Sequence, residues 1–192
     1  MRAVRGYHDS LVTRVALQLA PLLFVRPGEL RAAEWSEFDL EAAEWRIPAA
    51  RMKGKVPHVI PLSQQAIALL KEVQALTGSG RLVFPSERGH KRPMSANTLN
   101  AALRTLGYSK QQMTAHGFRH MASTLLNESG KWRHDAIERQ LAHTERDSVR
   151  AAYNAAEYLP ERRKMMQWWA DHLDALRDAD DKVVRLKPAV NG

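Results

Sequence analysis

Residues 11–25 read LVTRVALQLAPLLFV and contain only three polar side chains. The apolar side chains cover more than one helical face, which predicts a helix over residues 10–25 that is buried on most sides. Pro21 should kink or end this helix, and a second short helix is expected over residues 27–35, with a proline in its first turn. Arg26 is therefore expected at a buried junction between two helices.

Two stretches further along the chain, residues 44–48 and 57–61, alternate in the manner of β-strands. Between them lie residues 51–55, where Gly54 can supply a turn. The pattern predicts a small antiparallel sheet, with a third strand expected near residues 36–38.

Helical periodicity dominates after this sheet. Residues 78–80 and the polar stretch 85–93 are predicted to be loops, and residues 178–192 a loosely held tail. The predicted fold class is mainly α with a small antiparallel β-sheet, in one domain over residues 1–177. Its further helices are expected over residues 64–77, 95–106, 118–128, 135–142, 148–156 and 161–177.

The chain is strongly basic. It has 29 Lys and Arg against 21 Asp and Glu among 192 residues, a formal net charge of +8, and its pI is near 10.0. Residues 171–192 hold five acidic and four basic residues, which leaves +9 on the first 170. Such an excess on a folded domain is typical of proteins that bind a polyanion, most often a nucleic acid.

The absence of cysteine excludes disulfides, thiolate nucleophiles and cysteine zinc sites. The apolar runs are all shorter than the roughly 20 residues of a membrane span, and the first residues lack the apolar core of a signal peptide. A cytoplasmic protein without a membrane partner is therefore expected.

Five short strings contain cationic or proton-transferring residues. Each is weak alone, but the five in this order resemble the catalytic domain of the tyrosine recombinase (phage integrase) family, in the branch carried by prophages and genomic islands. The resemblance covers residues 7–176. The strings are FVRPGEL at 24–30, RMK at 51–53 with HVIPLS at 58–63, TAHGFRH at 114–120, LAH at 141–143 and VRAAYN at 149–154.

The resemblance implies a DNA breaking-rejoining fold and site-specific recombination through a covalent 3′-phosphotyrosine, without a metal ion, ATP or another cofactor. Such chemistry needs a nucleophile, cationic donors for the pentavalent transition state and an acid for the leaving 5′-oxygen. By resemblance, Tyr153 is the nucleophile. Arg26 and Arg119 would hold the non-bridging phosphate oxygens, and Lys53 would protonate the leaving oxygen.

Three further roles follow from the same resemblance. His116 would assist proton transfer, His143 would form a hydrogen bond with a phosphate oxygen, and Glu29 would orient an active-site arginine or histidine. The implied partners are double-stranded attachment-site DNA, other protomers in a DNA-bound tetramer and accessory DNA-bending proteins, at the bacterial nucleoid. The family's separate DNA-clamping domain would precede this one, so the chain is expected to be the C-terminal catalytic part of a larger integrase.

Two of these assignments have a rival. His143 and Tyr153 are ten positions apart, one more than in many family members, so Tyr158 is the alternative nucleophile. Five residues on a helix separate two side chains by about 140°, and both tyrosines cannot face the same phosphate. Lys55 is the alternative to Lys53, because residues two apart on a strand share a face.

Two other classes of function remain open from the sequence. A type IB topoisomerase would use the same phosphotyrosine chemistry to relax supercoils, whereas a basic DNA-binding module would need none of these polar residues. His116 and His120 share a helix face, but Gly117 stands where a zincin has glutamate, and Arg119 would repel a cation, so no metal site is expected. No role is assigned to His8, His58, His90, His134 and His172.

Overall fold

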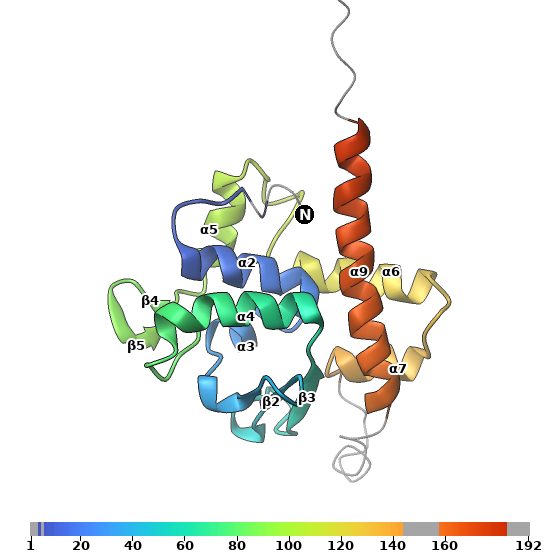
Figure 1. Cartoon of the computed structure of the whole chain (residues 1–192), viewed down its shortest axis with the longest axis horizontal. Helices are drawn as coiled ribbons and strands as arrows, with labels where there is room; N and C mark the ends of the chain where they lie inside the picture. Colours follow the sequence, from blue (N-terminus) through green and yellow to red (C-terminus); the bar gives the residue numbers. More distant parts are fainter. Residues whose placement is uncertain (1–3, 5, 144–157, 184–192) are drawn as a thin grey trace, which may run out of the picture.

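A computed structural model of the chain describes residue 4 and residues 6–143 and 158–183 (Figure 1). It is mostly helical with small antiparallel sheets, which confirms the predicted fold class. The strands are β1 (Phe38–Asp39), β2 (Glu44–Ile47), β3 (His58–Pro61), β4 (Pro85–Ser86) and β5 (Gly89–Pro93), and η1 (Trp35–Glu37) and η2 (Ala49–Arg51) are 3₁₀ turns. The helices are α2 (Leu11–Leu23), α3 (Pro27–Arg31), α4 (Gln64–Thr77), α5 (Thr98–Thr105), α6 (Gly117–Glu128), α7 (His134–Gln140) and α9 (Leu159–Val183).

Helix α2 is the core of the domain, as its apolar sequence predicts. It packs against α3, α4, α5, α6 and α9, and Figure 1 shows it among them. The Ser10 hydroxyl caps its first turn, and Pro21 lies in its last turn. Phe24 then adopts a left-handed conformation (φ 39°), which turns the chain away from the helix axis. This turn places Arg26 at the junction with α3, as predicted.

The three-stranded sheet has the order β1-β2-β3, and both pairs are antiparallel. Trp45 on β2 lies opposite Ile60 on β3, and both are fully buried. His58, two residues before Ile60, is buried on the same strand, because alternate residues share a face of the sheet. The predicted sheet, including its third strand, is therefore confirmed.

Two predicted elements are wrong. The helix expected over residues 27–35 ends at Arg31, because the backbone of Ala33 and Trp35 pairs instead with Val83 and Arg81. The stretch 85–93, predicted to be a loop, is the hairpin β4–β5. The sequence of this stretch is polar and begins and ends with proline, which is typical of a loop. Its two strands pair at only two positions, Pro85 with Pro93 and Ser86 with Gly89.

Helix α9 continues to Val183, six residues past its predicted end and into the predicted tail. The domain boundary at residue 177 stays a prediction. The helix expected over residues 148–156 lies outside the described residues. Among the described helices, none is both long and apolar enough to cross a membrane.

Candidate active site

Arg26 is held from two sides at the start of α3. One oxygen of the Glu29 carboxylate accepts the Arg26 backbone N–H (3.0 Å), and the other accepts Nη1 of its guanidinium (2.9 Å). Nη2 donates to the backbone carbonyl of Ala142 (3.0 Å). Glu29 is buried, whereas 27% of the Arg26 side chain is exposed. The guanidinium is therefore anchored from within the protein and still open to solvent.

Arg119 reaches the same place from α6. Its Nη1 donates to the carbonyl of Phe24 (3.1 Å), and its Nη2 donates to the carbonyl of Leu141. The residue is buried, and this burial, together with the nearby charge of Arg26, lowers the pKa of Arg119 to about 10. Arg119 therefore stays charged at neutral pH, with its guanidinium beside that of Arg26.

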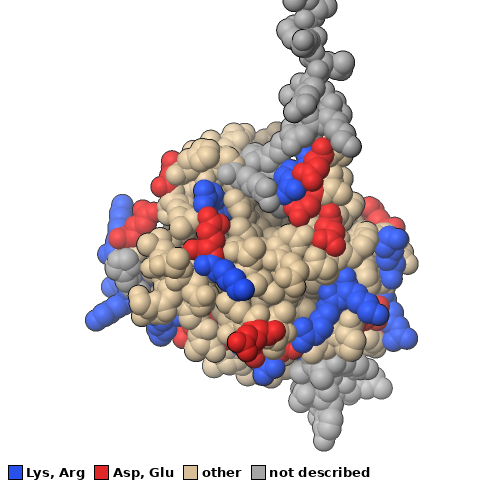
Figure 2. All heavy atoms as spheres, viewed as in Figure 1, with Lys and Arg blue, Asp and Glu red and all other residues tan. Residues whose placement is uncertain are grey.

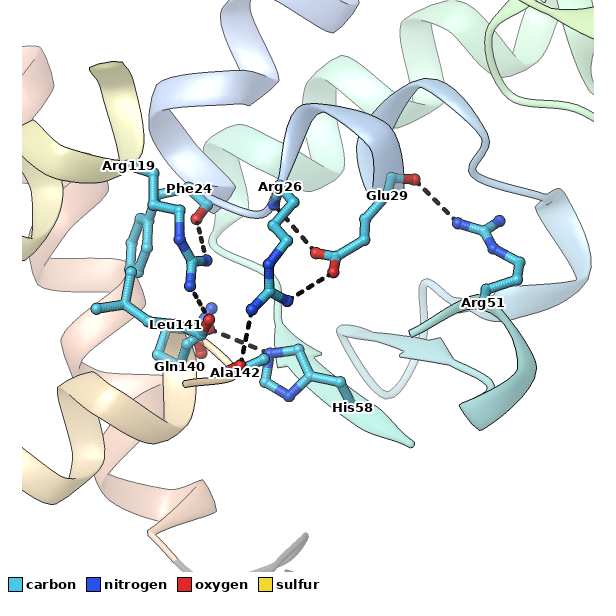
Figure 3. A network of polar contacts seen from close by, with 9 residues as sticks. All are labelled: Phe24, Arg26, Glu29, Arg51, His58, Arg119, Gln140, Leu141 and Ala142. Atoms are coloured by element: carbon cyan, nitrogen blue, oxygen red, sulfur yellow. Dashed lines mark hydrogen bonds and ion pairs between the residues drawn. The ribbon is translucent and has the colours of Figure 1, made fainter. Parts of the chain in front are cut away.

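Three successive carbonyls at the end of α7 receive these donors (Figure 3). We call the carbonyls of Gln140, Leu141 and Ala142 the carbonyl row. They accept hydrogen bonds from His58, Arg119 and Arg26, in that order. The last carbonyls of a helix have no partner within the helix and carry partial negative charge, so they attract cationic donors. The end of α7 thus brings the two predicted arginines together.

His116 and His143 lie at the ends of α6 and α7. Partial burial lowers the pKa of His116, and the neighbouring His120, Arg119 and Arg26 lower it further, so its ring is neutral at pH 7. His143 follows the carbonyl row, and its Nδ1 contacts a carboxylate oxygen of Glu138 at 2.7 Å. This contact orients the exposed imidazole of His143.

Lys53 lies in the exposed loop between η2 and β3. It forms no hydrogen bond or ion pair with any residue that the structure describes. The turn there places Lys55, and not Gly54, in the left-handed region (φ 54°). The premise that Lys53 and Lys55 share a strand face is wrong, because this segment is not a strand. The choice between the two lysines stays a prediction.

Tyr153 lies outside the described residues. Its rival Tyr158 immediately precedes α9, and the Arg133 guanidinium lies over its ring, 5.7 Å from the centroid. Arg133 precedes α7, whereas the carbonyl row is at the opposite end of that helix.

Sequence reasoning missed four residues around the site. Arg51 donates to the backbone carbonyl of Glu29 (2.9 Å) and pairs with Glu37 (3.0 Å), which holds the base of the lysine loop against α3. A buried polar cluster lies next to the carbonyl row and consists of His58, Gln140 and Arg162. The burial of His58 has a signal in the sequence, because it alternates with Ile60 on a strand. Arg162 and Gln140 have no such signal.

Charge is divided along α9. Arg162, Arg163 and Lys164 lie near its start, and acidic residues are concentrated in its second half. Figure 2 shows basic side chains gathered toward the lower end of this helix and acidic ones toward its upper end. Because Arg162 contacts Gln140, the basic end lies beside the arginine site. Among the described residues, no group of three or more His, Asp or Glu side chains could hold a metal ion.

Residues 1–159 match the family model described as the phage integrase family. The chain belongs to the phage integrase family. It is 48% identical over 187 residues to an integrase of Enterobacteria phage P4, covering 90% of this chain and 43% of the phage protein. It is 43% identical over 175 residues to the prophage integrase IntA of Escherichia coli K12, covering 91% of this chain and 42% of IntA. The prophage branch inferred from the sequence is therefore confirmed.

This chain spans less than half the length of these two relatives. Its fold matches an integrase from mycobacterium phage Brujita (TM-score 0.67, 20% identity, 86% of this chain and 54% of that chain). It also matches the lambda integrase catalytic core (TM-score 0.55, 21% identity, 77% of this chain and 87% of that chain). The comparisons therefore favour neither the topoisomerase nor the non-catalytic module.

Proposed function

We propose that the chain is the catalytic domain of a tyrosine-type site-specific recombinase that cuts and rejoins double-stranded DNA. One observation carries this proposal: the guanidinium groups of Arg26 and Arg119 are held together on adjacent carbonyls of one helix end. Two like charges repel, and an anion between them relieves the repulsion. Planar guanidinium forks suit the paired oxygens of a phosphate.

In the proposed reaction, the hydroxyl oxygen of Tyr153 attacks the phosphorus of the scissile phosphodiester. A 3′-phosphotyrosine forms, and the bond from phosphorus to the 5′-oxygen breaks. Lys53 gives its proton to the leaving oxygen, while Arg26 and Arg119 stabilise the charge on the non-bridging oxygens. The covalent intermediate keeps the energy of the broken bond, so rejoining by a 5′-hydroxyl needs no ATP.

The remaining residues support these steps. His116, neutral at pH 7, can accept the proton of the attacking tyrosine. His143, oriented by Glu138, would form a hydrogen bond with a phosphate oxygen. Glu29 keeps the Arg26 guanidinium facing the phosphate.

The place of Tyr158 supports Tyr153 as the nucleophile. The Tyr158 ring lies with Arg133 at the start of α7, and a seven-residue helix is about 10 Å long. The arginine pair is at the other end of this helix, so Tyr158 would have to leave its contact with Arg133 to reach a phosphate held there.

The proposed partners follow from charge and from the relatives. The first 170 residues carry +9, an excess that suits a polyanionic partner. A solved structure with the same fold is a lambda integrase dimer bound to a COC′ core site (TM-score 0.56). We extend the proposal to attachment-site DNA, to other protomers in a DNA-bound tetramer, to accessory DNA-bending proteins and to a place at the bacterial nucleoid.

A nicked suicide DNA substrate tests the proposal, because loss of a short 5′ fragment traps the covalent intermediate. We expect an adduct that maps to the peptide containing Tyr153 and that forms equally well in EDTA, since arginine and lysine supply the positive charge that other nucleases take from metal ions. Tyr153→Phe should eliminate the adduct, and Tyr158→Phe, the matched control, should retain it. An adduct on Tyr158, or one that requires magnesium, would contradict the proposed mechanism.

A further inference from the structure

His58 forms a buried hydrogen bond at the edge of the site. Only 3% of the residue is exposed, and its Nε2 lies 3.1 Å from the backbone carbonyl oxygen of Gln140. A carbonyl oxygen can only accept, so Nε2 carries the hydrogen and donates it. Burial, and then the charge of Arg162, lowers the pKa of His58 to about 3, which keeps the ring neutral at physiological pH.

This hydrogen bond joins the two parts of the site that come from distant segments. His58 is the first residue of β3 and directly follows the loop that carries Lys53. Gln140 provides the first carbonyl of the row whose next two members bind Arg119 and Arg26 (Figure 3). The His58 imidazole thus links the lysine-bearing hairpin directly to the arginine-binding end of α7.

A second buried side chain holds the same two elements together. Arg162 on α9 is fully buried, and its Nε and Nη2 donate to the Gln140 side-chain oxygen at 3.0 and 2.7 Å. Its Nη2 also donates to the carbonyl of Val59, next to His58 on β3. Buried polar groups are costly unless they are paired, so His58 and Arg162 favour one arrangement of β3 against α7.

We propose that His58 is a positioning residue, which sets the lysine-bearing hairpin and the carbonyl row at the distance that cleavage requires. The inference rests on the proposed function, because it assigns His58 an effect on the cleavage step. Its side chain would touch neither DNA nor the reacting atoms. Loss of the hydrogen bond should therefore slow cleavage while DNA affinity is unchanged.

Two substitutions separate the hydrogen bond from simple packing. His58→Gln keeps an N–H donor near the position of Nε2, whereas His58→Leu fills similar space without a donor. Thr77→Val is the matched control, because it removes buried hydrogen bonds to Val73 and Val83 at the end of α4. Each variant is measured for single-turnover cleavage of the suicide substrate, for DNA affinity, and for hydrogen exchange of the amides of residues 141–143.

We expect His58→Leu to cleave about 10- to 100-fold more slowly, the cost of a small misplacement of catalytic groups. Its DNA affinity should be unchanged, and the amides of residues 141–143 should exchange faster. His58→Gln should restore both cleavage and exchange protection, and Thr77→Val should resemble the wild type in both.

Three results would overturn the inference. These are wild-type cleavage by His58→Leu, equal losses in His58→Leu and His58→Gln, and equal losses in His58→Leu and Thr77→Val. Failure of the proposed function looks different, because the wild-type protein itself would then form no adduct. In that case the exchange data alone decide whether His58 holds the end of α7, and unchanged exchange in His58→Leu contradicts it.

Discussion

The arginine pair and the lysine loop differ in how the protein holds them. Arg26 and Arg119 donate to backbone carbonyls from two distant segments, at Phe24 and at residues 141–142, and the Glu29 carboxylate accepts a hydrogen bond from Arg26. Lys53 is exposed and contacts none of the described side chains through a hydrogen bond or ion pair. The groups proposed to stabilise charge are therefore anchored within the protein, whereas none of the described residues anchors the proposed proton donor through a hydrogen bond or ion pair.

This difference suits two kinds of chemistry. Electrostatic stabilisation of a transition state is strongest when its donors need no reorganisation. A proton donor has to reach one leaving atom, and a lysine on a four-carbon stem can do so once DNA orders its loop. In the proposed mechanism, the fold alone anchors the arginine pair that would hold the phosphate, whereas bound DNA would place the lysine that acts as the acid.

A large loss of activity is expected from a change in the arginine pair, which the fold anchors. Arg119→Lys keeps the charge, but an ammonium cannot reproduce the two-carbonyl anchoring of a guanidinium fork. We expect adduct formation to slow by about 10² to 10³, as for loss of a preorganised donor. Single-turnover cleavage measures this loss. Near wild-type cleavage would show that the charge alone matters and that the anchoring of the guanidinium does not.

A second prediction concerns the pH dependence of the unfolding free energy, to which the buried His58 contributes. Unfolded His58 takes up a proton near pH 6.5, whereas the folded residue does so only near pH 3. The unfolded state therefore binds more protons between these values, and the stability due to His58 is complete above pH 6.5 and lost as the pH falls. At pH 5 the wild type should lose about 2 kcal/mol more of its unfolding free energy than His58→Leu, each measured relative to pH 7.5.

Urea unfolding at a series of pH values measures this difference. Lys53→Ala, the control from the exposed loop, should follow the wild-type curve. Parallel curves for the wild type and His58→Leu would mean that His58 is protonated in the folded state.

A smaller loss of cleavage rate is expected when Glu29, the carboxylate that pairs with Arg26, is changed. Glu29→Gln retains an acceptor oxygen but removes the charge that pairs with the guanidinium. Cleavage should slow by about tenfold, equivalent to about 1.4 kcal/mol of transition-state stabilisation. Glu72→Gln, which removes a pair with Arg14 on a distant exposed surface, should have no effect. Equal rates for both variants would show that Arg26 needs no support from Glu29.

The parts of the fold with local signals could be predicted from the sequence. Helix α4 begins after Ser63, whose side chain caps it, and ends before Gly78, as expected. Pro21 and Pro27 marked the junction that holds Arg26. The hairpin β4–β5 could not be predicted, because its polar residues alternate too weakly to be distinguished from a loop.

In the candidate site, too, some groups could be predicted from the sequence and others could not. Side chains such as Arg26 and Arg119 lie in recognisable strings, so they could be selected. The carbonyl row could not, because every residue has a backbone carbonyl, and only the tertiary fold shows which ones lack partners. The role of His58 could not be predicted for the same reason: its partner is a backbone atom that lies 82 residues away in the sequence.

In the proposed mechanism, the arginine pair stabilises the charge on the phosphate while Lys53 donates a proton to the leaving oxygen. Replacing the bridging 5′-oxygen of the scissile phosphate by sulfur tests it most directly, because a thiolate leaves without a proton. Lys53→Ala should cleave normal DNA about 10² to 10⁴ more slowly and the sulfur-substituted DNA at nearly the wild-type rate. Arg119→Ala should be slow on both substrates. A Lys53→Ala protein that is equally slow on both would contradict the claim and would point to Lys55 or His116 as the acid.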